Sequence, residues 1–134
     1  ATGSEVEIAM TAADLLAAQT LIRRMPVGES VVDTILKLVR ACRPFTPEAD
    51  PSLGDSLSWG PGPRAAQALM LAVRARALLQ GRLAPSAEDV AALARPVLSH
   101  RMALSFAARA RGEQLGSVID RVAQRATGTR EAAA

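Results

Sequence analysis

Three consecutive residues, Gly62-Pro63-Arg64, combine a helix start with a side chain that can bind an anion. Gly62 suits the N-cap position, and Pro63 suits the first helical position because its missing N–H would have no partner there. The free N–H groups and partial positive charge of a helix N-terminus favour an anion, and the Arg64 guanidinium adds bidentate capacity for phosphate or carboxylate. The alternative is that Arg64 is an ordinary solvated arginine.

The rest of the sequence contains no other phosphate-binding motif that could complete such a site. A G-x-x-x-x-G-K-[ST] phosphate loop is absent, and Gly60 with Gly62 forms a lone G-x-G that no predicted strand precedes. One histidine and one cysteine cannot make a zinc site. His100 has no nucleophile or carboxylate partner in the pattern, so we expect it to be a structural hydrogen-bonding residue. The chain alone is therefore predicted to have no catalytic residues, no metal site and no bound cofactor.

Composition indicates one helical domain. The chain has 134 residues, of which 49% are hydrophobic and only 2% aromatic, so its core must consist of Ala, Leu, Val, Ile and Met. Such a core favours helix packing over sheets. The formal net charge of +3 is spread along the chain, which permits weak association with polyanions without requiring it. Cys42 is the single cysteine, so an internal disulfide is excluded and a reducing compartment is indicated. The simplest interpretation of Cys42 is a small core residue.

No apolar run approaches the length of a membrane span, and the first residues lack the basic-then-apolar pattern of a signal peptide. We therefore expect a cytoplasmic domain without a membrane partner. The missing signal means little if the sequence is a piece of a longer protein.

Hydrophobic spacing predicts an all-α bundle of five or six helices. Pairs such as Thr11 with Asp14, Ser30 with Asp33 and Ser86 with Asp89 mark three helix starts. Glu88 and Asp89 are interpreted as first-turn charges that the helix dipole favours. The predicted helices cover about Ala12 to Arg24, Ser30 to Cys42, Pro63 to Gln80, Ser86 to Leu98, the short stretch Ala107 to Arg111, and the residues after Gly112. Met102 to Phe106 is either a short extended piece or a turn.

Each longer helix has an expected buried face. The first should bury Leu15, Ala18, Ile22 and Met25, and the second Val32, Ile35, Leu36 and Val39. The helix from Pro63 is apolar nearly all round, which places it at the centre of the bundle.

A long loop rich in proline and glycine, Arg43 to Gly62, separates the second and third helices. Loops of this length in compact domains are usually functional or disordered. Trp59 lies in it and either anchors the loop to the core, which we expect, or meets a partner. Residues 1–10 are predicted to be a lead-in, residues 11–126 the helical domain, and residues 127–134 a frayed tail.

The order of these segments resembles the C-terminal helical lid subdomain of the MoxR family of AAA+ ATPases. The resemblance covers about Met10 to Val122 and rests on several pieces in sequence. These pieces are Leu15 to Val27, Val32 to Pro44, the Trp59-Gly-Pro-Gly-Pro-Arg-Ala65 stretch, Ala84 to Ala94, and Pro96 to Met102.

The resemblance implies a role for Arg64 as the sensor-2 arginine. In the family this residue reaches from the lid to the γ-phosphate of ATP bound in the preceding α/β core, and couples nucleotide state to the lid angle. Gly60, Gly62 and Pro63 would then be backbone close to the nucleotide. Gly62 replaces the family's usual Ser, and Cys42 replaces the usual Thr before Arg43; neither change affects Arg64.

The resemblance also implies what the full-length protein would be. It would be a cytoplasmic ATPase that uses ATP and Mg²⁺, forms a homo-oligomeric ring, and acts like a chaperone in assembling proteins or inserting metals. The partners of this chain would be the AAA+ core domain of the same protein, neighbouring subunits of the ring and a protein client that the sequence does not identify.

Two other functions stay open at this point. A basic helical module could bind nucleic acid through Arg74, Arg76, Arg82, Arg109 and Arg111, although we regard this partner as the weaker candidate. A nucleotide-independent interaction bundle could instead use the loop from Arg43 to Gly62 as its contact surface.

Overall fold

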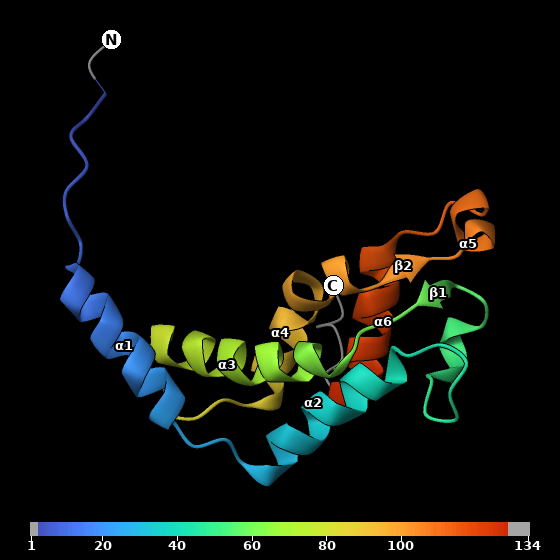
Figure 1. The fold of residues 1–134 in the computed structure, drawn as a ribbon, viewed down its shortest axis with the longest axis horizontal. Helices are drawn as coiled ribbons and strands as arrows, with labels where there is room; N and C mark the ends of the chain where they lie inside the picture. The colour runs from blue at the N-terminus through green and yellow to red at the C-terminus, as the bar shows by residue number, and fades with distance from the viewer. Residues whose placement is uncertain (1–2, 129–134) are drawn as a thin grey trace.

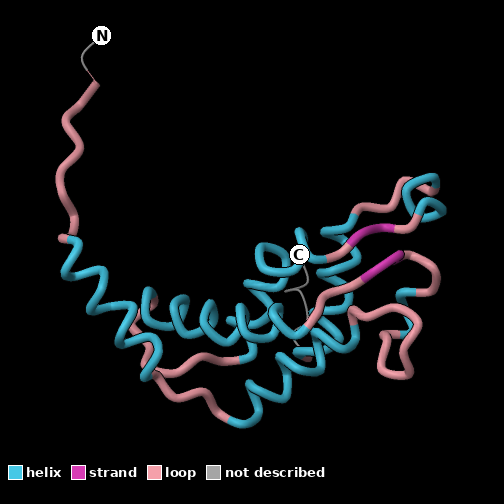
Figure 2. Tube along the Cα trace, viewed as in Figure 1, coloured by secondary structure: helices cyan, strands magenta, loops and turns pink. Residues whose placement is uncertain are grey.

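The computed structural model describes residues 3–128 and consists mainly of helices (Figures 1 and 2). The predicted all-α bundle is confirmed, with one small addition, a two-stranded antiparallel ribbon. The helices are α1 (Ala12–Arg24), α2 (Glu29–Ala41), α3 (Pro63–Leu79), α4 (Ala87–Leu98), α5 (Phe106–Ala110) and α6 (Leu115–Thr127). The strands are β1 (Leu57–Trp59) and β2 (Ala103–Leu104), and the 3-10 turns are η1 (Pro51–Leu53) and η2 (Ser99–Arg101).

The core lies among α2, α3, α4 and α6 and is entirely aliphatic. Its largest fully buried apolar side chains are Ile35, Leu38, Leu57, Leu69, Leu98, Ile119, Val39, Val73, Val90, Val118 and Val122. Aliphatic side chains of this kind pack between helices without the large flat rings that sheets accommodate. The composition had predicted this type of core.

The start signals at Thr11 and Ser86 are confirmed as capping boxes, in which Asp14 and Asp89 complete the pairs. The start at Ser30 is wrong, because α2 begins one residue earlier with Gly28 as its N-cap. Val31 and Leu38 are buried in α2, whereas Val32 and Leu36 are only half-buried. The face of α2 is set by packing against α6, α3 and α4, which its own apolar spacing does not reveal.

Helix α1 departs most from its predicted role. It packs on α3 and buries no residue of its own; Ala18 and Ile22 are half-buried, and Leu15 is 50% exposed. The expected core face is therefore wrong except for Met25, which is buried just beyond the helix end. A single neighbouring helix covers only a narrow stripe of α1. Figure 1 shows α1 at one end of the molecule, with residues 3–10 leading away from it.

Helix α3 is central on one face only. It packs against α1, α2 and α4 through Ala65, Leu69, Val73 and Ala77, but leaves Leu71 and Leu79 exposed. The predicted central place in the bundle is therefore correct for one face only, because no element among residues 3–128 covers the side that carries Leu71 and Leu79.

The segment between α2 and α3 is less irregular than its prolines and glycines suggested. It contains η1 and β1, and it buries Leu53 and Leu57 in the core. Of the two alternatives left open for the stretch from Met102, the extended one is correct for Ala103–Leu104, which pair with β1. Helix α6 ends at Thr127, inside the predicted tail, and residues 129–134 of that tail lie outside the described residues. None of the helices described has the length and hydropathy needed to cross a bilayer.

Candidate functional site

The backbone before Arg64 is held tightly against the end of α2. A Cβ atom placed on Gly60 would overlap the carbonyl oxygen of Cys42 and lie 3.0 Å from Cδ of Pro44. Arg43 Nε donates a hydrogen bond of 2.9 Å to the carbonyl oxygen of Pro61. These contacts fix the path of the chain from β1 into α3.

Replacing Gly60 with Ala should destabilise the domain by about 2 kcal/mol, because an added methyl forces the backbone of residues 42–44 away from α3. Urea unfolding followed by circular dichroism measures the loss. Gly62 is the matched control, since a Cβ there meets nothing within 4 Å and should cost only about 0.5 kcal/mol as a poorer N-cap. Equal losses for the two variants would contradict the proposed close contact at Gly60.

The start of α3 has the predicted form. Gly62 is the N-cap in an extended conformation, Pro63 is the first helical residue, and no side chain caps the first turn. The N–H groups of that turn are therefore free of side-chain partners. Arg64 is exposed, and no hydrogen bond or ion pair joins its side chain to another described residue. The structure thus presents a guanidinium and an uncapped helix N-terminus together at the surface, an arrangement that suits an anion.

Cys42 lies directly behind this segment and is fully buried. Burial, with a smaller contribution from the negative charge of Asp50, raises the pKa of its thiol to about 12. The thiolate is the reactive form of cysteine, so this residue is a core side chain and a poor nucleophile.

The native domain should therefore resist alkylation at Cys42. At pH 8 we expect negligible labelling by iodoacetamide in buffer and rapid labelling after unfolding in urea, measured by mass spectrometry. The single cysteine makes each label unambiguous. Fast labelling of the folded chain would show that the end of α2 opens readily.

Two residues for which the sequence predicted structural roles, Trp59 and His100, lie at the surface. Trp59 is 53% exposed at the end of β1, so the expectation that it anchors the loop to the core is wrong. His100 is exposed in η2 and makes no side-chain hydrogen bond within residues 3–128, so its expected structural role is wrong too. Leu53 and Leu57 supply the anchoring that had been assigned to Trp59.

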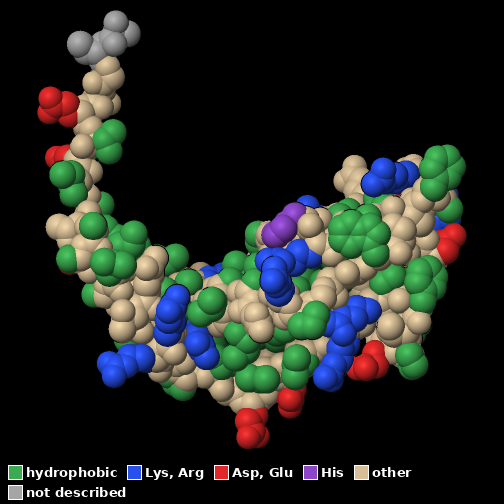
Figure 3. All heavy atoms as spheres, in the orientation of Figure 1, with side chains coloured by type: hydrophobic (Ala, Val, Ile, Leu, Met, Phe, Trp, Pro, Cys, Tyr) green, Lys and Arg blue, Asp and Glu red, His purple; other side chains and the backbone are tan. Residues whose placement is uncertain are grey.

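Most of the arginines that suggested nucleic-acid binding have partners inside the protein. Arg76 and Arg82 bind Asp89 at 2.5 and 2.6 Å, and Arg111 binds Asp55 and Glu113. Figure 3 shows the basic side chains scattered over the visible face instead of gathered in one patch. This distribution disfavours a polyanion site, because tight binding needs many free cations on one surface.

Asp89 is the first-turn acidic residue that was predicted, and it also forms buried ion pairs that the sequence did not indicate. Its carboxylate is completely buried, caps Ser86 N at 2.8 Å and accepts hydrogen bonds from both Arg76 and Arg82. Hydrogen bonds from Arg82 outweigh the effect of burial, and the pKa of Asp89 lies well below its usual range. The sequence indicated only the capping pair. Arg76 on α3 and Arg82, just after Gly81, approach Asp89 only because the chain turns at Gly81.

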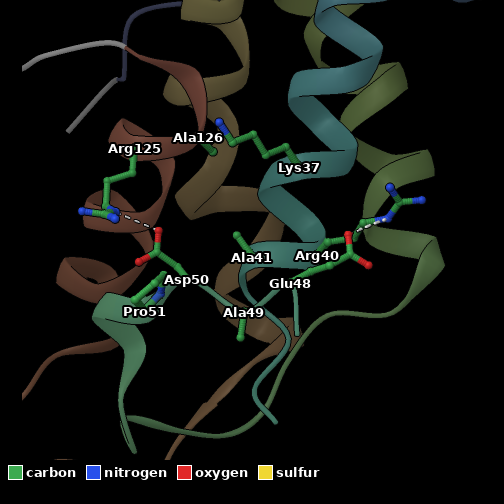
Figure 4. A pocket seen from close by; sticks show the side chains of 9 residues that line it. All are labelled: Lys37, Arg40, Ala41, Glu48, Ala49, Asp50, Pro51, Arg125 and Ala126. Carbon is green, nitrogen blue, oxygen red and sulfur yellow. Dashed lines mark hydrogen bonds and ion pairs between the residues drawn. The ribbon is translucent and has the colours of Figure 1, made fainter. Parts of the chain in front are cut away.

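A shallow groove of about 440 Å³ lies between the end of α2, the residues before η1 and the end of α6 (Figure 4). Arg125 binds Asp50 at 2.9 Å, and Arg40 faces Glu48 at 3.7 Å. Although burial opposes it, hydrogen bonds from Ser52 and Arg125 lower the pKa of Asp50. The ion pair between Asp50 and Arg125 joins the segment after α2 to α6, and the pair between Glu48 and Arg40 joins it to α2. Within residues 3–128, no three His, Cys, Asp or Glu side chains gather where they could hold a metal ion.

Comparisons with known proteins found domains of similar sequence and fold. The family model described as the AAA lid domain matches residues 54–122. The chaperone MoxR1 of Mycobacterium tuberculosis is 33% identical over 118 residues, which are 86% of this chain and 30% of that protein. A crystal structure from Cytophaga hutchinsonii, assigned as an ATPase, superimposes with a TM-score of 0.75 at 26% identity over 82% of this chain and 33% of that one. The chain therefore spans about a third of the length of these two relatives.

Proposed function

Because the chain belongs to the AAA lid domain family, we propose that it is the lid of a MoxR-like ATPase in which Arg64 senses the nucleotide. The observation that carries the proposal is the exposed, unpartnered Arg64 in the first turn of α3, beside N–H groups that no side chain caps. These groups form half of a phosphate site. The ATPase core of the same protein would supply the other half, including the residues that hold ATP and Mg²⁺.

A fixed guanidinium suits this task. Charge develops on the phosphoryl group during transfer, and a positioned arginine stabilises it without reorganising. Gly60, Gly62 and Pro63 would lie close to the nucleotide as backbone. The Arg43 bond to Pro61 and the packing of Gly60 hold them still.

The packing of α3 supports the coupling of nucleotide state to lid movement. Helix α3 contacts α1, α2 and α4, so a shift of Arg64 at its first turn is passed to the body of the bundle. ATP and ADP differ in the γ-phosphate that Arg64 would reach, and this differential contact is what a change of lid angle requires.

The apolar surface at the N-terminal end supports contact with a core domain. Residues 3–24 expose Val6, Ile8, Met10, Leu15, Leu16 and Leu21. Clustered exposed apolar side chains usually mark an interaction surface. Following the resemblance to the MoxR family, the whole protein would act in the cytoplasm as a homo-oligomeric ring, assembling client proteins or inserting metals.

The deciding experiment is ATP turnover by the full-length protein with Arg64 intact and replaced. The isolated chain should not hydrolyse ATP. A polynucleotide that binds residues 1–134 tightly, with a steep dependence on salt, would instead favour the nucleic-acid function.

A further inference from the structure

The single tryptophan of the sequence lies on the surface beside the segment that carries Arg64. Trp59 is half-exposed, and within the described residues its indole nitrogen donates no hydrogen bond. The core contains no aromatic side chain, and burying this one would have been favourable. The indole is therefore left at the surface at the end of β1, on the strand that leads directly into the segment carrying Arg64.

The spacing between Trp59 and Arg64 is fixed by the fold. Trp59 pairs with Ala103 across the ribbon, and Gly60 lies against the end of α2. Pro61 is buried and its carbonyl is held by Arg43, after which Pro63 begins α3. Four residues lie between Trp59 and Arg64, so their Cα atoms are at most about 18 Å apart. The backbone positions from which the indole and the guanidinium extend are therefore fixed relative to each other, and neither group has a partner among the described residues.

The two groups have complementary chemistry for one ligand. An indole offers a flat π face on which another aromatic ring can stack, and a guanidinium binds phosphate oxygens. A nucleoside triphosphate has an aromatic base at one end and its terminal phosphate at the other. We propose that Trp59 stacks on the base of the nucleotide whose γ-phosphate Arg64 senses. This inference rests on the proposed function and adds the residue that recognises the base.

The test compares a ligand that has a base with one that lacks it. In the full-length protein, Kd is measured by calorimetry for ATP and for inorganic triphosphate. Trp59→Ala should weaken ATP binding about tenfold and leave triphosphate binding within twofold, because stacking on a base acts only on ATP. Trp59→Phe, which keeps a flat ring, should retain ATP binding within about threefold.

Phe106→Ala is the matched control. Phe106 is 89% exposed but begins α5, beyond the opposite end of the ribbon from Arg64, so both ligands should bind as before. Equal thermal unfolding midpoints for the variants establish that each is folded.

The outcomes separate this inference from the proposed function. Unchanged ATP binding by Trp59→Ala would overturn the stacking role, and so would an equal loss for ATP and triphosphate, which would make Trp59 a support for the segment. In either case a fall in ATP turnover by Arg64→Ala would leave the lid function standing. If neither Trp59→Ala nor Arg64→Ala changes any nucleotide property, both the inference and the proposed function fail.

Discussion

Replacing Arg64 with Ala should lower the ATP turnover of the full-length protein about a hundredfold. The variant loses a positioned cation at the γ-phosphate, and removing one such preorganised group from a transition state typically costs two to three powers of ten. Arg64→Lys should recover only part of the rate, since an ammonium lacks the planar, bidentate geometry of a guanidinium. Steady-state phosphate release at saturating ATP measures the effect.

Arg109→Ala provides the matched control for charge. The Arg109 side chain is exposed in α5 and has no partner in the described part of the chain. The substitution therefore removes one positive charge, as Arg64→Ala does, but at the opposite end of the ribbon. Turnover should stay within twofold. If Arg64→Ala and Arg109→Ala behave alike, the assignment of Arg64 as the nucleotide sensor is refuted. The stability of the lid should be unaffected by either change, because neither side chain contributes an internal bond.

Replacing Asp89 with Asn should destabilise the isolated chain by about 3 kcal/mol, the lower end of the range for removing one partner of a buried ion pair. The lower end applies because Arg76 and Arg82 are each about one-third exposed and can turn to water. Asn keeps an oxygen that can cap Ser86, so the variant removes the charge and preserves the cap. Urea unfolding at pH 7 gives the difference in the free energy of unfolding.

Glu88→Gln, in the same turn of α4, is the control and should change stability by less than 0.5 kcal/mol because Glu88 is exposed. The pH dependence gives a second readout. The pKa of Asp89 is lower in the folded chain than the ordinary value of 3.8, so the folded state binds fewer protons in acid than the unfolded state does. The stability that Asp89 contributes is complete above the unfolded pKa of 3.8 and is lost as pH falls toward the folded pKa. Asp89→Asn should flatten this part of the acid unfolding curve, and an unchanged curve would show that Asp89 is not the titrating group.

The class of fold and the form of the candidate site could both be predicted from the order of residues alone. The aliphatic composition and apolar spacing required helices, and the Thr11 and Ser86 pairs marked two of their starts correctly. Gly62-Pro63-Arg64 could be interpreted locally, because an N-cap, a first-turn proline and a first-turn arginine depend only on neighbouring residues.

Which apolar faces are buried and which charges are paired depends on the packing of the helices and could not be predicted in this way. Leu15 and Trp59 are as hydrophobic as core residues, but no element of the described chain covers them, and coverage is a property of packing. Asp89 became a buried ionic centre because the turn at Gly81 brings Arg76 and Arg82 to it. Helix starts depend on a few adjacent residues, whereas burial and ion pairing depend on where distant segments come to lie, which a local pattern does not encode.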